Sequence, residues 1–342
     1  MPDNDKKAVI ELSKKGSRLF RSGQYEEAKE AYLKALEIDQ NNTYVLSGLG
    51  DVYRKLCRFE ESGKYYDAVL VIDKTNVFAL RGAGDARRGM QNPEQAIPFW
   101  LRYLEINSKD SHVMVRVADA FNKLEQHVDA IAMYEQALAI SSDDPFALMG
   151  LGNLYYASNQ DDRALTCFER LLNGNSQNVV VMTMTGNLYR RRMEYDRAIE
   201  NYRNALEIEP DNSFALFGMG DSFRGHKDME QAVFWWQKIL QHEPRNQALR
   251  SRVGDAQILL GRLDEAVSNF NHCLSIGEDI FSYIGLAHVE RERGDFQAAI
   301  EFCKKALHVD STHPRILSEL AAMQEAAGDH EAAQATRDLI TD

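Results

Sequence analysis

Residues 150–172 read GLGNLYYASNQDDRALTCFERLL, and this stretch decides the fold. In and just before it, Leu148, Leu151 and Tyr155 share one face at the i, i+3, i+7 spacing of an amphipathic helix. After a polar break at residues 159–160, Ala164 and Phe168 begin a second apolar stripe of the same kind. The stretch therefore predicts two short helices joined by a tight turn.

The same pattern recurs along the chain every 34 residues. A small residue in the first helix returns at Gly16, Gly50, Gly84, Ala118, Gly152, Gly186, Gly220 and Gly254. A second small residue follows it at Ala28, Ser62, Ala96, Ala130, Ala164, Ala198, Ala232 and Ala266. An aromatic residue comes next at Tyr32, Tyr66, Trp100, Tyr134, Phe168, Tyr202, Trp236 and Phe270. Three series in one register predict a repeat protein, because no single helix pair buries such faces alone.

One residue is lost near Ser275–Asp279, after which the register resumes to the end. We expect an N-terminal leader at 1–8 and one solenoid at 9–342, with the last repeat acting as a C-terminal cap because Arg337 replaces its aromatic residue. Its ten repeats start at residues 9, 43, 77, 111, 145, 179, 213, 247, 280 and 314. Asn or Asp precedes most first helices and is expected to cap them, at Asn42, Asn76, Asp110, Asp144, Asn178, Asn212 and Asn246.

This spacing of small, Ala and aromatic positions resembles the tetratricopeptide repeat, and Pro210 and Pro244 match the closing proline of that family. The resemblance covers nearly everything from residue 9 onward. It implies an all-α solenoid, a right-handed superhelix whose first helices line a concave groove. It also implies a protein that binds other proteins or peptides rather than an enzyme.

Composition agrees with a folded, helical chain of this class. The 342 residues are 44% hydrophobic and 27% charged, with 7 prolines. The net charge of −12 argues against general nucleic-acid binding, and no apolar run is long enough for a membrane span. The four cysteines are widely spaced, as in reduced cytoplasmic proteins. The histidines and cysteines show no metal-ligand spacing, so neither a cofactor nor a metal is expected.

The family places groove residues at positions 2, 5, 6, 9, 12 and 13 of each repeat. In this chain those positions combine aromatic rings, carboxylates, amides and basic groups, although the whole molecule is acidic. The predicted peptide-binding groove comprises Tyr44, Asp51, Arg54, Lys55, Phe78, Arg81, Asp85, Arg88, Arg116, Asp119, Lys123, Phe146, Asn153, Tyr156, Asn187, Arg190, Arg191, Phe214, Asp221, Arg224 and Asp255. Asn and Asp would hold a peptide backbone, and Arg and Lys would select carboxylates.

Two structural interpretations stand beside this one. Position 9 and position 12 are i, i+3 neighbours, so their Asp and Arg side chains would pair within one helix for about 0.2–0.5 kcal/mol. The aromatic residues at position 2 would pack against the preceding repeat. The Lys, Asn, Asn, Lys and Arg set that chaperone-binding members use as a carboxylate clamp is missing, which disfavours a chaperone-tail receptor.

We therefore expect a protein-interaction scaffold that holds an extended, acidic or C-terminal segment of a protein partner. One alternative is a structural protein that self-associates into a homo-oligomer. Another is the regulatory part of an enzyme whose catalysis resides on a different chain. Asn153 and Asn187 resemble the inner asparagines of repeat-bearing glycosyltransferases.

Overall fold

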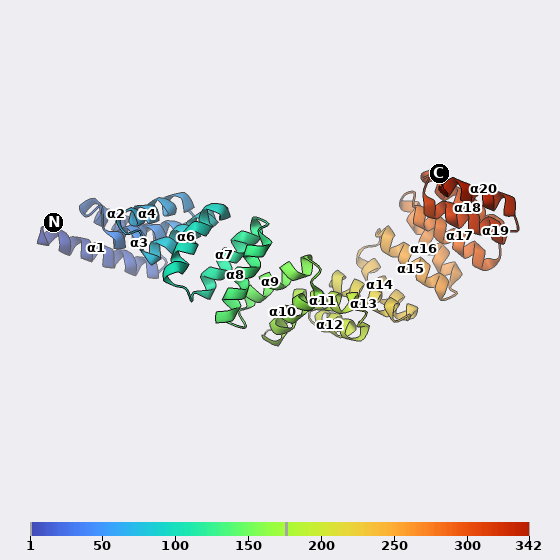
Figure 1. The fold of residues 1–342 in the computed structure, drawn as a ribbon, viewed down its shortest axis with the longest axis horizontal. Helices are drawn as coiled ribbons and strands as arrows, with labels where there is room; N and C mark the ends of the chain where they lie inside the picture. Colours follow the sequence, from blue (N-terminus) through green and yellow to red (C-terminus); the bar gives the residue numbers. More distant parts are fainter. Residues whose placement is uncertain (1, 175–176, 342) are drawn as a thin grey trace. The chain divides into compact units, whose positions relative to one another are not determined.

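The computed structural model describes residues 2–174 and 177–341, and the chain divides into two compact units, one within residues 1–174 and one within 175–342. The described residues form twenty α-helices and no strand (Figure 1). In the first unit these are α1 (Asp3–Arg21), α2 (Tyr25–Ile38), α3 (Thr43–Lys55), α4 (Phe59–Ile72), α5 (Val77–Gly89), α6 (Pro93–Ile106), α7 (Ser111–Lys123), α8 (His127–Ile140), α9 (Pro145–Ala157) and α10 (Asp161–Gly174). In the second unit they are α11 (Val179–Arg191), α12 (Tyr195–Ile208), α13 (Ser213–Gly225), α14 (Met229–His242), α15 (Gln247–Leu259), α16 (Leu263–Ile276), α17 (Ile280–Arg293), α18 (Phe296–Val309), α19 (Pro314–Ala326) and α20 (His330–Thr341).

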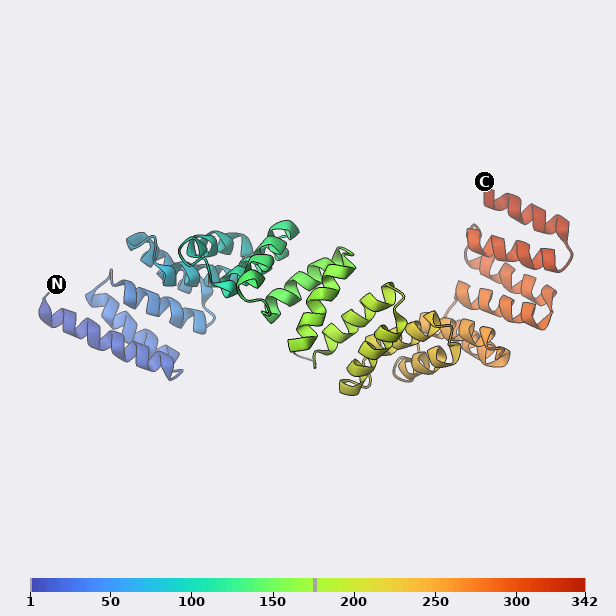
Figure 2. The ribbon, with the colours of Figure 1, turned by 60° about the horizontal axis from the view of Figure 1, so that its bottom comes forward.

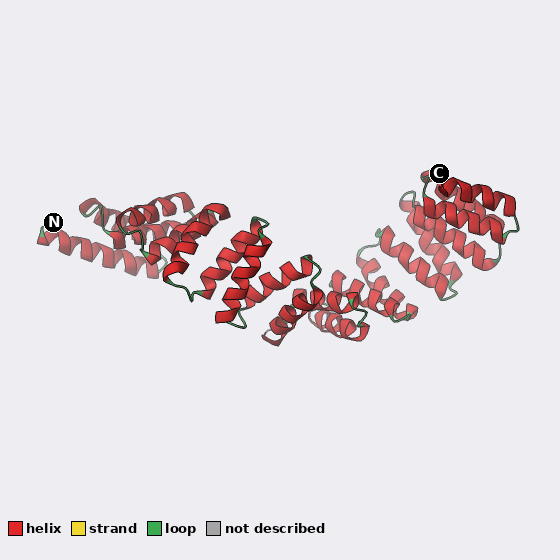
Figure 3. Cartoon of the chain, in the orientation of Figure 1, coloured by secondary structure: helices red, strands yellow, loops and turns green. Residues whose placement is uncertain are grey.

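Helix pairs are the building block of both units. Each odd-numbered helix packs on the even-numbered helix that follows it, and inside a unit each pair packs on the next. Short turns join the helices (Figure 3), and the antiparallel stacking is visible for α17 to α20 in Figure 2. Every predicted repeat start from residue 43 to 314 coincides with the first residue of a helix. The all-α helix-pair architecture is thereby confirmed, while the single continuous superhelix over 9–342 stays a prediction.

The first helix differs from its prediction. It begins at Asp3, so most of the expected leader is helical, and Val9 is its first buried residue. Two aspartates, Asp3 and Asp5, lie in its first turn, where the helix dipole favours negative charge. The packed part of the repeat starts at residue 9, and the helix extends beyond it.

The expected caps are present in the structure. The side chain of Asn76 accepts a hydrogen bond from the Ala79 amide, and that of Asn212 accepts one from Ala215 at 3.0 Å. The same geometry occurs at Asn42, Asp110, Asp144, Asn178 and Asn246, and also at Asp279. These caps satisfy amides that the helix itself leaves unpaired, so they fix where each repeat begins.

Left-handed backbone at one residue makes each turn inside a helix pair. Glycine supplies it at Gly23, Gly261, Gly294 and Gly328. Six other repeats use a residue with a side chain instead, with φ between 56° and 65°: Cys57, Gln91, Glu125, Asn159, Met193 and Lys227. A left-handed residue with a Cβ costs about 1–2 kcal/mol, so packing of the two helices must hold these turns closed.

Aromatic rings lie against the helix backbone wherever the sequence has the paired glycines. The Tyr66 ring contacts Gly50 of its own repeat and Gly82 of the next, and a methyl group added at Gly82 would lie 2.3 Å from its Cζ atom. The Tyr66 ring therefore lies between the second glycine of one Gly-x-Gly and the first glycine of the next, on two successive odd-numbered helices. The Gly-x-Gly forms no phosphate loop, because both glycines lie inside helices.

The cysteines are free in the structure, with Cys57 exposed and the other three buried. Burial raises the pKa of the Cys303 thiol to about 12. Within the described residues, no helix combines the length and the apolar character that crossing a bilayer demands.

Candidate functional site

The surface formed by positions 2, 5, 6, 9, 12 and 13 of the odd-numbered helices is called the first-helix face below. Its position-2 side chains are largely exposed: Tyr44 59%, Phe78 68%, Phe146 70%, Val180 61%, Phe214 79% and Phe281 57%. These residues are therefore not buried against the preceding repeat, although the Tyr44 hydroxyl lies 2.7 Å from the Ser17 oxygen of that repeat. Large apolar groups left in water in successive repeats are typical of a surface that binds something.

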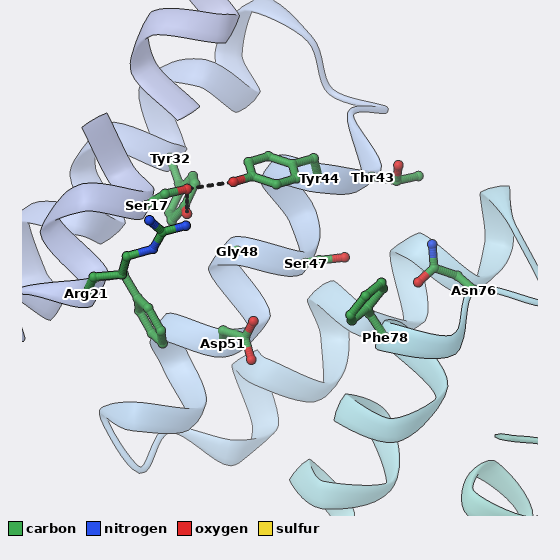
Figure 4. Close-up of a pocket in the computed structure, with 11 residues that line it drawn as sticks. Ser17, Arg21, Tyr32, Thr43, Tyr44, Ser47, Gly48, Asp51, Asn76 and Phe78 are labelled. Atoms are coloured by element: carbon green, nitrogen blue, oxygen red, sulfur yellow. Dashed lines mark hydrogen bonds between the residues drawn. The ribbon is translucent and has the colours of Figure 1, made fainter. Parts of the chain in front are cut away.

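A first cavity of about 380 Å³ lies on this face between α1, α3 and α5. Tyr44 on α3 and Phe78 on α5 line this cavity together with Asp51 on α3 and Arg21 on α1 (Figure 4). The Tyr32 ring lies against Gly48, where an added methyl group would be 2.6 Å from its Cζ atom. The cavity thus combines two exposed rings with one acidic and one basic group.

Hydroxyl groups hold one wall of this cavity. The Tyr44 and Ser17 oxygens lie 2.7 Å apart, and the Ser17 and Tyr32 oxygens lie 2.9 Å apart, as the dashed lines of Figure 4 mark. Burial raises the pKa of Tyr32, so its hydroxyl stays protonated and able to donate. This chain of hydroxyls fixes the orientation of the Tyr44 ring.

A second cavity of about 390 Å³ lies further along the same face. Arg81, Arg88 and Arg116 line it together with Asp119 and Phe146. An adjoining cavity of about 270 Å³ shares Arg88, Arg116 and Asp119 and adds Lys123. Asp110 and Asp144 also line the second cavity, and Asp85 pairs with Arg116, so the basic groups of this part of the face lie among carboxylates.

Position 9 has a different partner depending on the aromatic residue of the second helix. Where that residue is tyrosine, its hydroxyl donates to position 9: Tyr66 to Asp51 at 2.9 Å, and Tyr202 to Asn187 at 2.7 Å. Tyr134 donates to Asp119 in the same way. These position-9 residues therefore have a structural role, because each accepts a hydrogen bond from a buried tyrosine.

Where the aromatic residue is tryptophan, position 9 pairs with arginine from the following repeat. Arg116 donates to both Asp85 oxygens at 2.7 and 3.0 Å, in the repeat that contains Trp100. Arg252 lies 2.7 Å from Asp221, in the repeat that contains Trp236. These ion pairs join neighbouring repeats, unlike the pairing within one helix that the spacing suggested.

Asp221 is the most highly paired of these carboxylates. Arg190 approaches its Oδ2 atom at 3.0 Å, while Arg252 and Arg224 approach Oδ1 at 2.7 and 3.5 Å. The four residues come from α11, α13 and α15, and we call them the Asp221 centre. In the described residues, positions 9 and 12 pair within one helix for Asp221 and Arg224 and for Asp51 and Arg54, whose atoms are 3.0 Å apart.

The structure brings the predicted residues together unevenly. Tyr44, Asp51 and Phe78 meet in the first cavity, and Arg190, Asp221 and Arg224 meet in the Asp221 centre. Arg54 and Asp85 pair with residues of the first and second cavities, Asp51 and Arg116. The remaining predicted residues line none of these sites: Lys55, Asn153, Tyr156, Asn187, Arg191, Phe214 and Asp255. Their contact with a ligand, like that of the whole set, stays a prediction.

Sequence reasoning missed some residues that line or build these sites. Ser17 and Arg21 line the first cavity from α1, and Arg252, which is absent from the predicted groove, pairs with Asp221. A signal for Ser17 and Arg21 was present, since they occupy positions 9 and 13 of the repeat that starts at residue 9. A second signal is a 136-residue offset, which relates Arg54, Asp85, Arg88, Trp100 and Arg116 to Arg190, Asp221, Arg224, Trp236 and Arg252.

Comparison with known families agrees with this architecture. A family profile described as "TPR repeat" matches residues 16–56 and 186–224. A second, described as "Tetratricopeptide repeat", matches residues 122–180 and 290–342. The chain is a tetratricopeptide-repeat protein. No curated protein sequence matches it with significance.

Solved structures resemble it in fold. A pilF structure from Pseudomonas aeruginosa has a TM-score of 0.52 at 18% identity, with 62% of this chain and 97% of that chain covered. YrrB, described as a TPR protein with an unusual peptide-binding site, has a TM-score of 0.49 at 21% identity, with 55% and 97% covered. Yeast Tom70 has a TM-score of 0.40 at 14% identity, with 98% and 92% covered.

Proposed function

We propose that this protein is a non-catalytic scaffold that binds an extended segment of a partner protein on its first-helix face. The observation that carries the proposal is the row of exposed position-2 rings beside cavities lined by arginine and aspartate. In the first unit, Phe78 borders the first cavity and Phe146 borders the second. A partner segment that inserts apolar side chains there would remove these rings from water.

Arginine donors support acidic residues in that segment. Arg81, Arg88 and Arg116 line the second cavity beside Asp110, Asp119 and Asp144, and Lys123 lies in the adjoining one. Guanidinium groups bind carboxylates through paired hydrogen bonds, which adds geometric selection to the attraction of opposite charges. The preferred ligand is therefore a segment that combines apolar residues with acidic ones.

The proposal is tested with peptides selected on the wild-type protein from a displayed random library. The double variant Phe78→Ser/Phe146→Ser should weaken binding of the selected peptides by more than about tenfold, because each buried ring contributes about 1.5–3 kcal/mol. Fluorescence anisotropy measures the affinities.

A matched control uses equally exposed apolar residues on the even-numbered helices. Val71 on α4 and Val128 on α8 are 81% and 82% exposed. The variant Val71→Ser/Val128→Ser should bind the selected peptides as the wild type does. Loss of binding in the valine variant with retention in the phenylalanine variant would place the binding surface elsewhere and refute the proposal.

A further inference from the structure

The Asp221 centre contains more positive charge than its own carboxylate neutralises. Three guanidinium groups against one carboxylate leave a net charge of +2. The Asp221 side chain is 5% exposed, whereas those of Arg190, Arg224 and Arg252 are 31%, 46% and 35% exposed. The side that faces solvent therefore consists of cationic N–H donors, with the balancing oxygen atoms beneath them.

Aromatic rings hold two of these arginines in place. The guanidinium carbon atoms of Arg224 and Arg252 lie 5.9 and 5.7 Å from the centroid of the buried Trp236 ring. Arg252 also lies 5.0 Å from the centroid of Phe217. Cation–π contacts of this kind reduce the freedom that the side chains lose when a ligand binds. The donors are thus arranged before any ligand arrives.

One amide allows the third arginine to join. In the second unit the residue at position 9 before Asp221 is Asn187, which is neutral and accepts the Tyr202 hydroxyl. Arg190 therefore bonds across the repeat boundary to Asp221. In the first unit the equivalent residue is Asp51, which bonds Arg54 within the same helix. In the described residues, three arginines meet at one carboxylate only at Asp221, where the preceding repeat has Asn at position 9.

We propose that the Asp221 centre binds the phosphate group of a phosphorylated side chain on the partner segment; this rests on the function proposed above. A phosphomonoester carries a charge of about −1.5 to −2 at neutral pH and presents three acceptor oxygens. It matches the net charge of the centre, whereas a carboxylate neutralises only half of it. Clustered arginines are a recurring means of recognising phosphorylated peptides.

The spacing of Phe214 and Asp221 adds a sequence preference. Both lie on α13, seven residues apart, which places them on one face about 10 Å apart along the helix axis. A peptide in the extended polyproline II conformation advances about 3.1 Å per residue with three residues per turn, so side chains three positions apart share a face and span about 9 Å. The preferred ligand therefore has an apolar residue three positions from the phosphorylated one, with the apolar side chain against the exposed Phe214 ring.

The test uses fluorescein-labelled degenerate peptide pools that contain a fixed Phe three residues from phosphoserine. Matched pools carry Ser or Glu in place of phosphoserine. Full-length wild-type protein should bind the phosphoserine pool about tenfold more tightly than either matched pool, measured by anisotropy. Inorganic phosphate should compete only weakly, because it lacks the contact with Phe214.

Two variants remove the site without removing its fold. In Arg252→Ala, Asp221 keeps Arg190 and Arg224 as partners, so thermal unfolding should be little changed. In Asn187→Asp, a new carboxylate competes for Arg190, as Asp51 does for Arg54. Both variants should lose the preference for phosphoserine. The matched control is Arg262→Ala, which removes the same charge from an arginine that pairs with Glu230 away from the centre, and it should retain the preference.

Three results would overturn the inference: equal binding of the phosphoserine and serine pools, equal binding of the phosphoserine and glutamate pools, or equal losses in Arg252→Ala and Arg262→Ala. The serine pool separates this outcome from failure of the proposed function. If Phe214→Ala weakens binding of the serine pool while phosphate adds nothing, the scaffold function stands and the phosphate site falls. If no pool binds the wild type, the phosphate site is refuted, while the peptides selected from the library still test the scaffold function separately.

Discussion

Asp51 and Asn187 occupy the same place in their repeats, and the difference between a carboxylate and an amide decides where the nearby arginine binds. Each accepts a hydrogen bond from the tyrosine hydroxyl of the second helix of its own repeat, Tyr66 and Tyr202 respectively. Asp51 also attracts Arg54, three residues later on the same helix. Asn187 has no charge to offer Arg190, which reaches Asp221 in the next repeat instead. A single side chain thereby controls whether arginines spread along the face or converge.

This argument predicts a gain of function in the first unit. In Asp51→Asn, Arg54 should leave position 51 and pair with Asp85, which already binds Arg116. With Arg88, three residues after Asp85 and the counterpart of Arg224, the variant would then contain a second group of three arginines around one carboxylate. Isothermal titration with a phosphoserine peptide from the pool should change from one site in the wild type to two.

The control for this prediction is Asp51→Glu, which keeps the carboxylate and should leave a single site. Unchanged stoichiometry in Asp51→Asn would mean that Arg54 is held by something other than its charge. The Asn side chain still accepts the Tyr66 hydroxyl, so the buried ring should remain in place.

At the scale of the helix pair, aromatic rings seated on glycines determine how closely the helices approach. Trp236 is fully buried, and a methyl group added at Gly220 would lie 2.3 Å from its Nε1 atom. Glycine costs about 1 kcal/mol relative to alanine inside a helix, so it would be replaced unless the contact required it. The ring on α14 and the bare backbone of α13 therefore form one packing unit.

Gly220→Ala should lower the free energy of unfolding by about 1–3 kcal/mol, because the buried indole has no free space into which to move. The matched control is Gly277→Ala, where an added methyl group meets no atom within 4 Å. Thermal or urea unfolding followed by circular dichroism measures both. A Gly220→Ala protein as stable as the wild type would show that the ring is not held rigidly.

At the scale of the whole molecule, the chain consists of two units that each present a first-helix face. The first contains the cavities that Phe78 and Phe146 border, and the second contains the Asp221 centre. These sites share no residue. Energetic effects of changes at sites without shared partners add within about 0.3–0.5 kcal/mol.

We therefore expect independent contributions to binding of the short phosphoserine peptides. Phe78→Ser/Phe146→Ser should leave their affinity unchanged, and adding these changes to Arg252→Ala should weaken binding no more than Arg252→Ala alone. Anisotropy measures the affinity of the phosphoserine peptides for four proteins: the wild type, Phe78→Ser/Phe146→Ser, Arg252→Ala and the combination of these changes. A clear departure from additivity would indicate that the units respond to one another.

The sequence by itself determined the helix pairs, their starting residues and the capping side chains. These depend on contacts within a few residues, such as Asn76 with Ala79, and periodicity records such contacts directly. It also identified Arg190, Asp221 and Arg224 as members of one face, because the repeat register assigns each residue to a face.

Only the tertiary structure decided which arginine meets which carboxylate. Arg190 and Arg252 lie 31 residues before and after Asp221, and they reach it only because stacked repeats bring equivalent positions together. Spacing along one helix favoured i, i+3 pairs instead, and local energies of that size are easily overcome by packing. The exposure of Phe78 and Phe214 also follows from stacking, since the sequence alone could not separate a packed ring from a free one.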